Sequence, residues 1–125
     1  MKILLILSAL FLSILSKEGC LKPKGNGTFF KGRLEVKGIC MNYTIKVLEG
    51  NIDKSLIEEK WTDETTGKSY TDVFALGSRC TFPSSIEQGG EFTFIIDTAQ
   101  MQNCAVCLAY YPTPAKHLSI KVLDK

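Results

Sequence analysis

Hydrophobic and polar residues alternate in four short runs along the chain. These runs cover residues 29–37, 43–47, 92–96 and 118–122. In the first run, Phe30, Leu34 and Val36 alternate with charged side chains. A period of two is typical of a β-strand that buries one face and exposes the other. The pattern therefore predicts four half-buried strands, separated by residues that form turns.

Three further segments complete the predicted order of elements. The apolar residues of segment 52–61 fit both the helical and the strand spacing. The sequence TDETTG at residues 62–67 is rich in turn formers and predicts a hairpin that continues into residues 68–76. Residues 103–111 are apolar and predict another strand, which ends at two prolines. Short strands with little helix predict a mainly β domain, an antiparallel barrel with one or two short helices.

The first residues have the composition of a secretory signal peptide. Lys2 precedes an apolar run over residues 3–15, which is too short to span a bilayer comfortably. Ser16 is a small residue suited to a cleavage site, so we expect residues 1–16 to be removed and residues 17–125 to form one secreted, extracellular domain. No second apolar run reaches spanning length, which predicts a protein that does not insert into a membrane.

The net charge argues against two classes of partner. The whole chain has 15 lysine and arginine residues and 13 acidic residues, and the signal peptide contains one of the lysines. The secreted domain is therefore close to neutral. Proteins that bind nucleic acid or an anionic membrane through charge usually have a strongly basic surface. We therefore predict neither nucleic acid nor membrane as a partner.

All five cysteines follow the signal peptide, namely Cys20, Cys40, Cys80, Cys104 and Cys107. In a secreted chain this number predicts a disulfide framework with one thiol left over, and spacing alone does not reveal the pairing. The last two cysteines have the C-x-x-C spacing of redox and zinc sites. The chain has no second C-x-x-C and only one histidine, so two disulfide halves are the better interpretation.

No combination of residues in the sequence predicts an active site. The single histidine, His117, is not matched with a nucleophile, and we expect it to be exposed or to cap an element. The neighbouring acids Asp63 and Glu64 fit charged, hydrated turn residues better than an acid–base pair, which needs one buried carboxyl. We therefore predict a protein that is not an enzyme and that needs no metal or other cofactor.

Two N-x-T sequons begin at Asn26 and Asn42. In a secreted eukaryotic chain, both asparagines are candidate acceptors of N-linked glycans. Asn26 lies in a lead-in rich in proline and glycine, so it is the more accessible candidate in the sequence.

Residues 73–108 contain Cys80, a glycine pair at 89–90, the aromatic and aliphatic run at 92–96, and Cys107 in an apolar segment. This order resembles the middle of a netrin-like domain, the type found in tissue inhibitors of metalloproteinases. A single compact domain behind a signal peptide is also similar to small excretory–secretory proteins of parasitic nematodes. The resemblance implies an OB-type barrel of five strands, flanked by helices, that acts by binding.

The resemblance also implies a disulfide pairing. A netrin-like domain bridges its N-terminal cysteine to the body of the barrel, which here implies a bridge from Cys20 to Cys80 or Cys107. We accordingly predict the bridge Cys20–Cys80, together with a bridge from Cys40 to Cys104 or Cys107. The remaining thiol is then expected to be buried and inert.

The N-terminus departs from the pattern of the inhibitors. In the inhibitors, the first mature residue is a cysteine, and its amino group and carbonyl chelate the zinc of the protease. Here the expected first residue is Lys17, and Lys22 replaces a second cysteine of the inhibitor motif. A displaced amino group cannot occupy the open position of a catalytic zinc. Metalloproteinase inhibition is therefore an alternative and not the preferred function.

A second resemblance competes with the first. The sequences FKGRLEVKG at 30–38, IKVLEG at 45–50 and TDETTGK at 62–68 resemble those of nematode transthyretin-like proteins, which form a β-sandwich. These proteins usually have a cysteine beside the first strand, a position that Cys40 fits. The sandwich does not require a bridge from Cys20.

The preferred function is that of a secreted, monomeric binding protein that engages a host or other extracellular protein through loops displayed on the barrel. The candidate loops are the lead-in and the turns at 65–68 and 84–90. Trp61, Tyr110 and Tyr111 are candidate aromatic contacts, although core packing would also explain them. The predicted contact residues are Lys22, Lys24, Thr66, Lys68 and Glu87.

Overall fold

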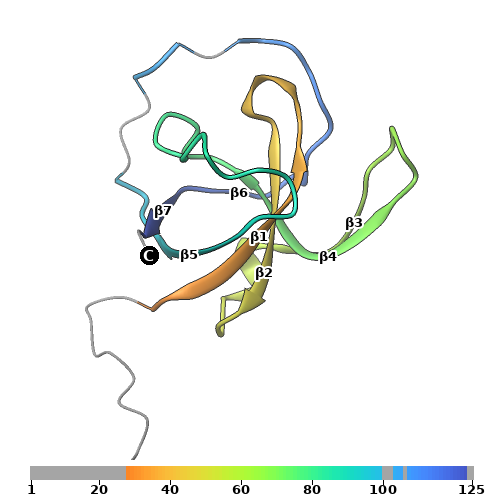
Figure 1. Ribbon diagram of the computed structural model, residues 1–125. Coiled ribbons are helices and arrows are strands. Elements are labelled where there is room, and N and C mark those ends of the chain that lie inside the picture. The colour runs from red at the N-terminus through yellow and green to blue at the C-terminus, as the bar shows by residue number, and fades with distance from the viewer. Residues whose placement is uncertain (1–27, 100–102, 106, 124–125) are drawn as a thin grey trace, which may run out of the picture.

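The structure is a computed structural model that describes residues 28–99, 103–105 and 107–123 (Figure 1). It is mainly β, as the alternating pattern predicts. The strands are β1 (Phe30–Lys37), β2 (Tyr43–Glu49), β3 (Glu58–Thr62), β4 (Ser69–Leu76), β5 (Glu91–Ile96), β6 (His117–Leu118) and β7 (Ile120–Leu123). The short helices are two 3₁₀ segments, η1 (Ile39–Met41) and η2 (Lys54–Leu56).

Local sequence signals account for most of these elements. Every second residue of β1 is buried, in phase with its alternating sequence. The ambiguous segment 52–61 divides into η2, which the Asp53 side chain caps through the backbone N–H of Ser55, and the strand β3. The turn at 62–67 joins β3 to β4 as predicted. The predicted strand at 103–111 is wrong, because the described residues of this segment form no strand.

The strands form one twisted sheet whose hydrogen-bonded order is β3-β4-β2-β1-β5-β7 (Figure 1). Neighbours along this path are antiparallel. The path is open, with β3 and β7 at its two ends. β6 lies off the path and pairs with β4 in parallel. Only Ser119 separates β6 from β7, so the C-terminal segment links β4 to β5 without forming one continuous closing strand.

Ser78 connects the end of β4 to the start of β7. Its buried hydroxyl donates a hydrogen bond to the carbonyl oxygen of Ile120 (2.8 Å) and accepts one from the backbone N–H of the same residue (2.9 Å). The neighbouring amide of Gly77 donates to the carbonyl of Leu118 (2.9 Å). The Ser78 hydroxyl thus takes the place of a neighbouring strand as the hydrogen-bond partner of the Ile120 backbone.

We expect Ser78→Ala to lower the free energy of unfolding by about 2–3 kcal/mol, because it leaves a buried amide and a buried carbonyl without a partner. Thr44→Val is the matched control: the Thr44 hydroxyl is also buried but has no hydrogen-bond partner among the described residues. Removing that hydroxyl is expected to be neutral or to stabilise by about 1 kcal/mol. Chemical denaturation of both variants tests this, and equal losses would contradict it.

Aromatic side chains fill the space inside the curved sheet. The ring of Phe94 is fully buried and lies 5.5 Å from the ring of Phe30, 5.9 Å from that of Phe74 and 5.9 Å from that of Phe92, measured between centroids. Phe82 extends this cluster from Phe92 toward the start of β2. Such ring pairs stabilise beyond the area that they bury. Phe94 is therefore the centre of the core.

Two disulfides join distant parts of the chain, Cys40–Cys107 and Cys80–Cys104, with Cα–Cα distances of 5.3 and 5.5 Å. The first is one of the two pairings predicted for Cys40. The second shows that the predicted Cys20–Cys80 bridge is wrong, and that Cys104, the thiol left over once Cys40 pairs with Cys107, is not free but bonded to Cys80. Cys20 itself lies outside the described residues. Two structural disulfides are typical of an oxidising, extracellular compartment.

Candidate binding surface

The chain between β5 and β6, residues 97–116, has no regular secondary structure in its described part. In Figure 1 it passes over the top of the sheet. Connections of this length without helix or strand are uncommon in compact domains and are usually functional or disordered. Here two disulfides attach the connection to the rest of the domain: Cys104 to the loop after β4, and Cys107 to the turn between β1 and β2. A tethered connection of this kind is the first candidate for a binding surface.

The turn between β1 and β2 receives the disulfide from Cys107. Cys40 and Met41 both have left-handed backbone conformations, with φ of 58° and 60°, and the N–H of Asn42 donates to the carbonyl of Ile39 (3.1 Å). Left-handed turns between strands usually contain asparagine or glycine, because other side chains are strained there. Such strain persists where the surrounding structure fixes the backbone, and it is frequent at functional sites. The disulfide is one of the bonds that fix this turn.

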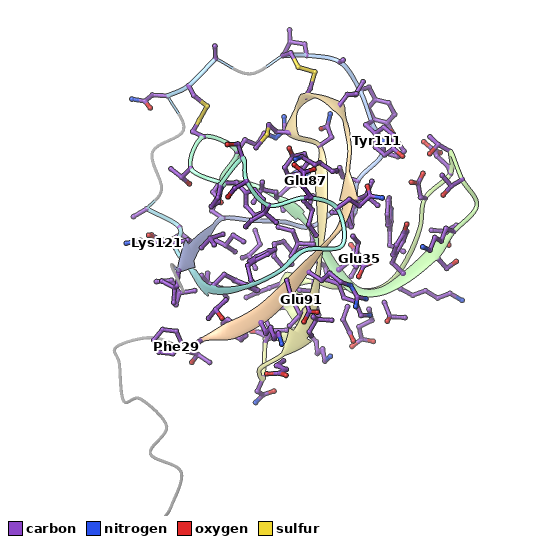
Figure 2. All side chains as sticks on the ribbon, viewed as in Figure 1. Phe29, Glu35, Glu87, Glu91, Tyr111 and Lys121 are labelled. Carbon is purple, nitrogen blue, oxygen red and sulfur yellow. A yellow bond between two sulfur atoms is a disulfide. The ribbon has the colours of Figure 1, made fainter. Side chains whose placement is uncertain are left out.

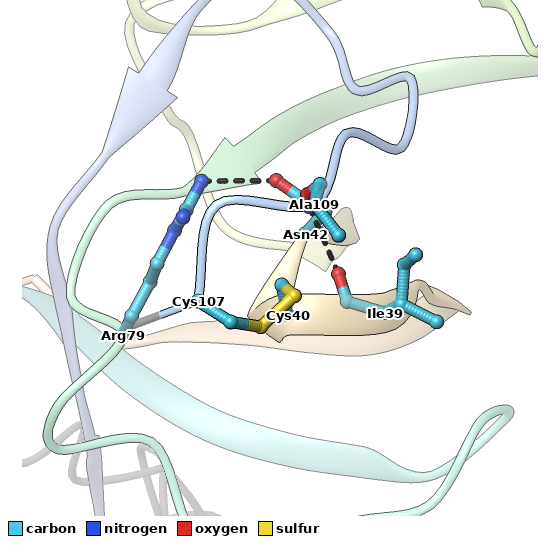
Figure 3. The surroundings of a disulfide bond; sticks show 6 residues. All are labelled: Ile39, Cys40, Asn42, Arg79, Cys107 and Ala109. Atoms are coloured by element: carbon cyan, nitrogen blue, oxygen red, sulfur yellow. Dashed lines mark hydrogen bonds between the residues drawn. A yellow bond between two sulfur atoms is a disulfide. The ribbon is translucent and has the colours of Figure 1, made fainter. Parts of the chain in front are cut away.

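Asn42 and Arg79 hold the turn and the connection together (Figure 3). The Asn42 side-chain amide donates to the carbonyl of Ile39 (2.8 Å) and to the carbonyl of Ala109 (3.0 Å). Its oxygen accepts a hydrogen bond from the Arg79 guanidinium (3.0 Å). All three polar groups of one side chain are therefore in use beside the Cys40–Cys107 bridge.

This geometry bears on the Asn42 sequon. A glycan would replace one hydrogen of an amide nitrogen that already donates twice, on a side chain that is only 9% exposed. We therefore expect no glycan at Asn42 in the folded, secreted protein. The intact mass of secreted protein from eukaryotic cells, before and after enzymatic deglycosylation, tests this together with peptide mapping. A glycan found on Asn42 would contradict the hydrogen-bonded arrangement. The other sequon, at Asn26, lies outside the described residues.

Three large apolar side chains are exposed on the two segments that the Cys40–Cys107 bridge joins. Leu108 is 96% exposed, Tyr110 is 78% exposed and Ile39 is 58% exposed. Ile39 and Leu108 are the direct chain neighbours of the two bridged cysteines, so the disulfide brings their backbones together. Exposed apolar groups that gather in one place often mark a site where a partner binds.

Two tyrosines, Tyr110 and Tyr111, fasten the connection to the β3–β4 turn. The Tyr110 hydroxyl donates to the Glu64 carboxylate (3.2 Å), and the Tyr111 hydroxyl donates to the Asp63 carboxylate (3.2 Å). The ring of Tyr111 also packs on Gly38, where an added Cβ would approach the ring to within 2.9 Å. The absence of a side chain at Gly38 thus lets Tyr111 lie against the end of β1.

Asp63 organises the turn on which Tyr111 rests. Its carboxylate accepts hydrogen bonds from the backbone N–H (2.8 Å) and the hydroxyl (2.6 Å) of Thr65. Burial raises the pKa of this carboxyl, but the hydrogen bonds from Thr65 and Tyr111 outweigh it and hold the pKa of Asp63 below its ordinary value. These hydrogen bonds stabilise the folded protein fully when the pH is above the pKa that Asp63 has in the unfolded chain. The stabilisation is lost as the pH falls through the lower pKa that Asp63 has in the folded protein. Asp63 is a turn residue, as predicted, but it is buried and not hydrated.

The other predicted contact residues lie in separate places. Thr66 and Lys68 are exposed in the β3–β4 turn, and the Lys68 ammonium lies 5.3 Å from the centre of the Tyr70 ring, on which Trp61 stacks. The predicted turn at 65–68 and the two candidate tyrosines of the connection are thus neighbours. Trp61 packs within the hairpin and is only partly exposed.

Glu87 lies in the loop before β5, away from the β3–β4 turn (Figure 2). Its carboxylate forms an ion pair with Lys37 (3.1 Å). Beside this loop is a shallow groove of about 670 Å³, whose lining includes Ile86, Phe92 and Val122. The predicted contacts Lys22 and Lys24 lie outside the described residues.

The described residues contain no group of three or more histidine, cysteine or acidic side chains placed to hold a metal ion. Within the same residues, no helix has the length and apolar character needed to cross a membrane. His117 is exposed, as predicted from its isolation in the sequence.

Most residues that build this surface are absent from the contacts predicted from the sequence. Ile39, Leu108 and Arg79 are not among those contacts, and Asn42 was predicted only as a glycan acceptor. The available signal was the sequence CLAYYP, in which apolar residues stand between a cysteine and a proline. A bridged cysteine and a proline both limit the conformations of the residues between them.

No protein-family model matches the chain, and no significant match was found among curated proteins or solved structures. The netrin-like and transthyretin-like resemblances therefore stay predictions.

Proposed function

We propose that this chain is a secreted, non-enzymatic protein that binds another extracellular protein, of a host or of its own organism. The contact surface is residues 107–111, here called the 107–111 loop, together with Ile39 in the neighbouring turn. The observation that carries the proposal is the exposure of Leu108, Tyr110 and Ile39 on two segments that one disulfide joins.

The way in which this loop is held supports recognition. The disulfide at Cys107, the hydrogen bond from Asn42 to Ala109, and the contacts of Tyr111 fix its backbone at three points. A loop that is ordered before binding loses little conformational entropy when a partner binds. Large exposed apolar and aromatic side chains on such a loop are typical of residues that dominate binding energy.

The test compares binding by the wild-type chain with binding by the variant Leu108→Ser/Tyr110→Ser. Extracellular proteins that cross-link to the wild type are identified by mass spectrometry, and their affinities are then measured with purified proteins. Phe29→Ser is the matched control, because Phe29 is another exposed aromatic residue (41%) at the opposite end of the molecule (Figure 2). We expect a loss of at least about tenfold for the double variant and none for the control. Equal affinities of all three would refute the proposal.

The alternatives receive less support. A netrin-like inhibitor was expected to bridge Cys20 to Cys80 or Cys107, and both of those cysteines are bonded to others. A transthyretin-like sandwich has two packed sheets, whereas the strands here belong to one connected sheet. The pairings run from β6 through β4, β2, β1 and β5 to β7, and only Ser119 separates β7 from β6 in the chain. This nearly circular order agrees better with a partly open OB-type barrel.

A further inference from the structure

We infer that the 107–111 loop is a substrate-like loop that blocks a serine endopeptidase with an apolar S1 pocket, and that Leu108 is the side chain inserted into that pocket. This inference rests on the proposed function, since it names the class of the partner. The segment that occupies the protease is the loop itself and not the N-terminus of the chain.

The side chain and backbone of Leu108 are both free to be bound. The side chain is 96% exposed. Among the described residues, neither its amide nor its carbonyl has a hydrogen-bond partner. Endopeptidases recognise an extended segment through its backbone groups, as an added strand, and through one side chain in the S1 pocket. An apolar pocket such as that of chymotrypsin suits leucine.

The flanking residues hold the loop on both sides of the Leu108–Ala109 peptide bond. On one side, Cys107 is bonded to Cys40. On the other side, the carbonyl of Ala109 accepts a hydrogen bond from Asn42 (3.0 Å). Cys40 and Asn42 both belong to the turn between β1 and β2, so this one turn supports the chain on both sides of the peptide bond.

Further along, Tyr110 and Tyr111 are held by carboxylates of the β3–β4 turn. The Tyr110 hydroxyl donates to Glu64, and the Tyr111 hydroxyl donates to Asp63. Both bonds use the far end of the side chain and leave the backbone of the loop at the surface. The loop therefore enters a protease cleft without an ordering step, which is how pre-organised inhibitors gain affinity.

The contacts on both sides of the Leu108–Ala109 bond would make the loop an inhibitor and not merely a substrate, because they would hold both ends of the chain in place after cleavage. Hydrolysis would add one water molecule across the Leu108–Ala109 bond. The new carboxylate would stay attached through Cys107, and the new amine would stay attached through Ala109 and Tyr111. Because neither end can diffuse away, religation, which releases the same water, competes with product release. The protease thus remains occupied.

The experiment uses the secreted chain with α-chymotrypsin and with trypsin, each assayed on a small chromogenic substrate. We expect the wild-type chain to inhibit chymotrypsin and not trypsin. Leu108→Lys should weaken inhibition of chymotrypsin by at least about 100-fold and create inhibition of trypsin. Circular dichroism checks the fold of the variant, although a side chain that is almost fully exposed contributes little to it. Phe29→Ser should leave both results unchanged.

Three outcomes would overturn the inference. The first is that the wild type inhibits neither enzyme, and the second is that Leu108→Lys does not change which enzyme is inhibited. The third is rapid cleavage of the Leu108–Ala109 bond without inhibition. If the inference fails while Leu108→Ser/Tyr110→Ser still abolishes binding to another extracellular protein, the proposed function stands. If neither assay responds to changes at Leu108, both fail.

Discussion

Replacing Phe94 by alanine is expected to lower the free energy of unfolding by about 3–5 kcal/mol. The side chain is fully buried, and its ring contacts those of Phe30, Phe74 and Phe92 from three other positions in the sheet. The truncation removes apolar contacts on several sides and leaves a cavity that the rigid strands cannot collapse to fill. Denaturation with guanidinium chloride under non-reducing conditions measures the loss.

Phe29→Ala is the control for this measurement. Phe29 is close to Phe30 in sequence, but its side chain is 41% exposed. Its truncation should change the free energy of unfolding by less than about 1 kcal/mol. A similar loss for both variants would show that Phe94 is not at the centre of the core.

Removing the Cys40–Cys107 bridge by the double change to alanine is expected to lower the free energy of unfolding by about 3–4 kcal/mol. The bridge joins residues 67 positions apart, so it restricts a large loop of the unfolded chain. The same change removes one of the three contacts that fix the 107–111 loop. Loss of partner binding should therefore accompany the loss of stability, even at temperatures at which the variant is folded.

Cys20→Ala is the control for this variant. The four bridged cysteines leave no other cysteine of the chain for Cys20 to bond with. We therefore expect this change to leave both the stability and the binding of the monomer unaltered. A loss comparable to that of the double variant would support the N-terminal bridge that the netrin-like resemblance implies.

The sequence was most informative where a strand buries one face. The alternation in residues 29–37 predicts β1 correctly because side chains on a strand point to opposite faces, and burial selects one set. The turn at 62–67 was also predictable, because its residues favour turns through local contacts. The burial of Asp63 could not be predicted from the sequence, because it depends on Tyr111, which is 48 positions away.

The same reasoning failed for residues 103–111. Apolar residues predict a strand only if burial is the reason for their presence. Here Leu108 and Tyr110 are exposed, and disulfides hold the segment in place of a hydrogen-bonded ladder. The pairing of Cys80 with Cys104 could not be predicted either, because it depends on how the chain returns to the sheet after β5. Spacing in the sequence carries no such information.

The most direct test of the account is the disulfide map of the secreted protein. Without reduction, trypsin and a glutamate-specific protease should give the peptides 38–46, 80–87 and 92–116 as one linked species. The third peptide contains two cysteines. Fragmentation of its backbone between Ala105 and Val106 therefore determines which cysteine is linked to which of the other two peptides.

The account predicts that the fragment with Cys104 contains peptide 80–87 and that the fragment with Cys107 contains peptide 38–46. This result would place the 107–111 loop on the β1–β2 turn, as recognition through Leu108 requires. A peptide that links Cys20 to Cys80 or to Cys107 would contradict this arrangement, because one of the two disulfides that attach the 97–116 connection would then be absent.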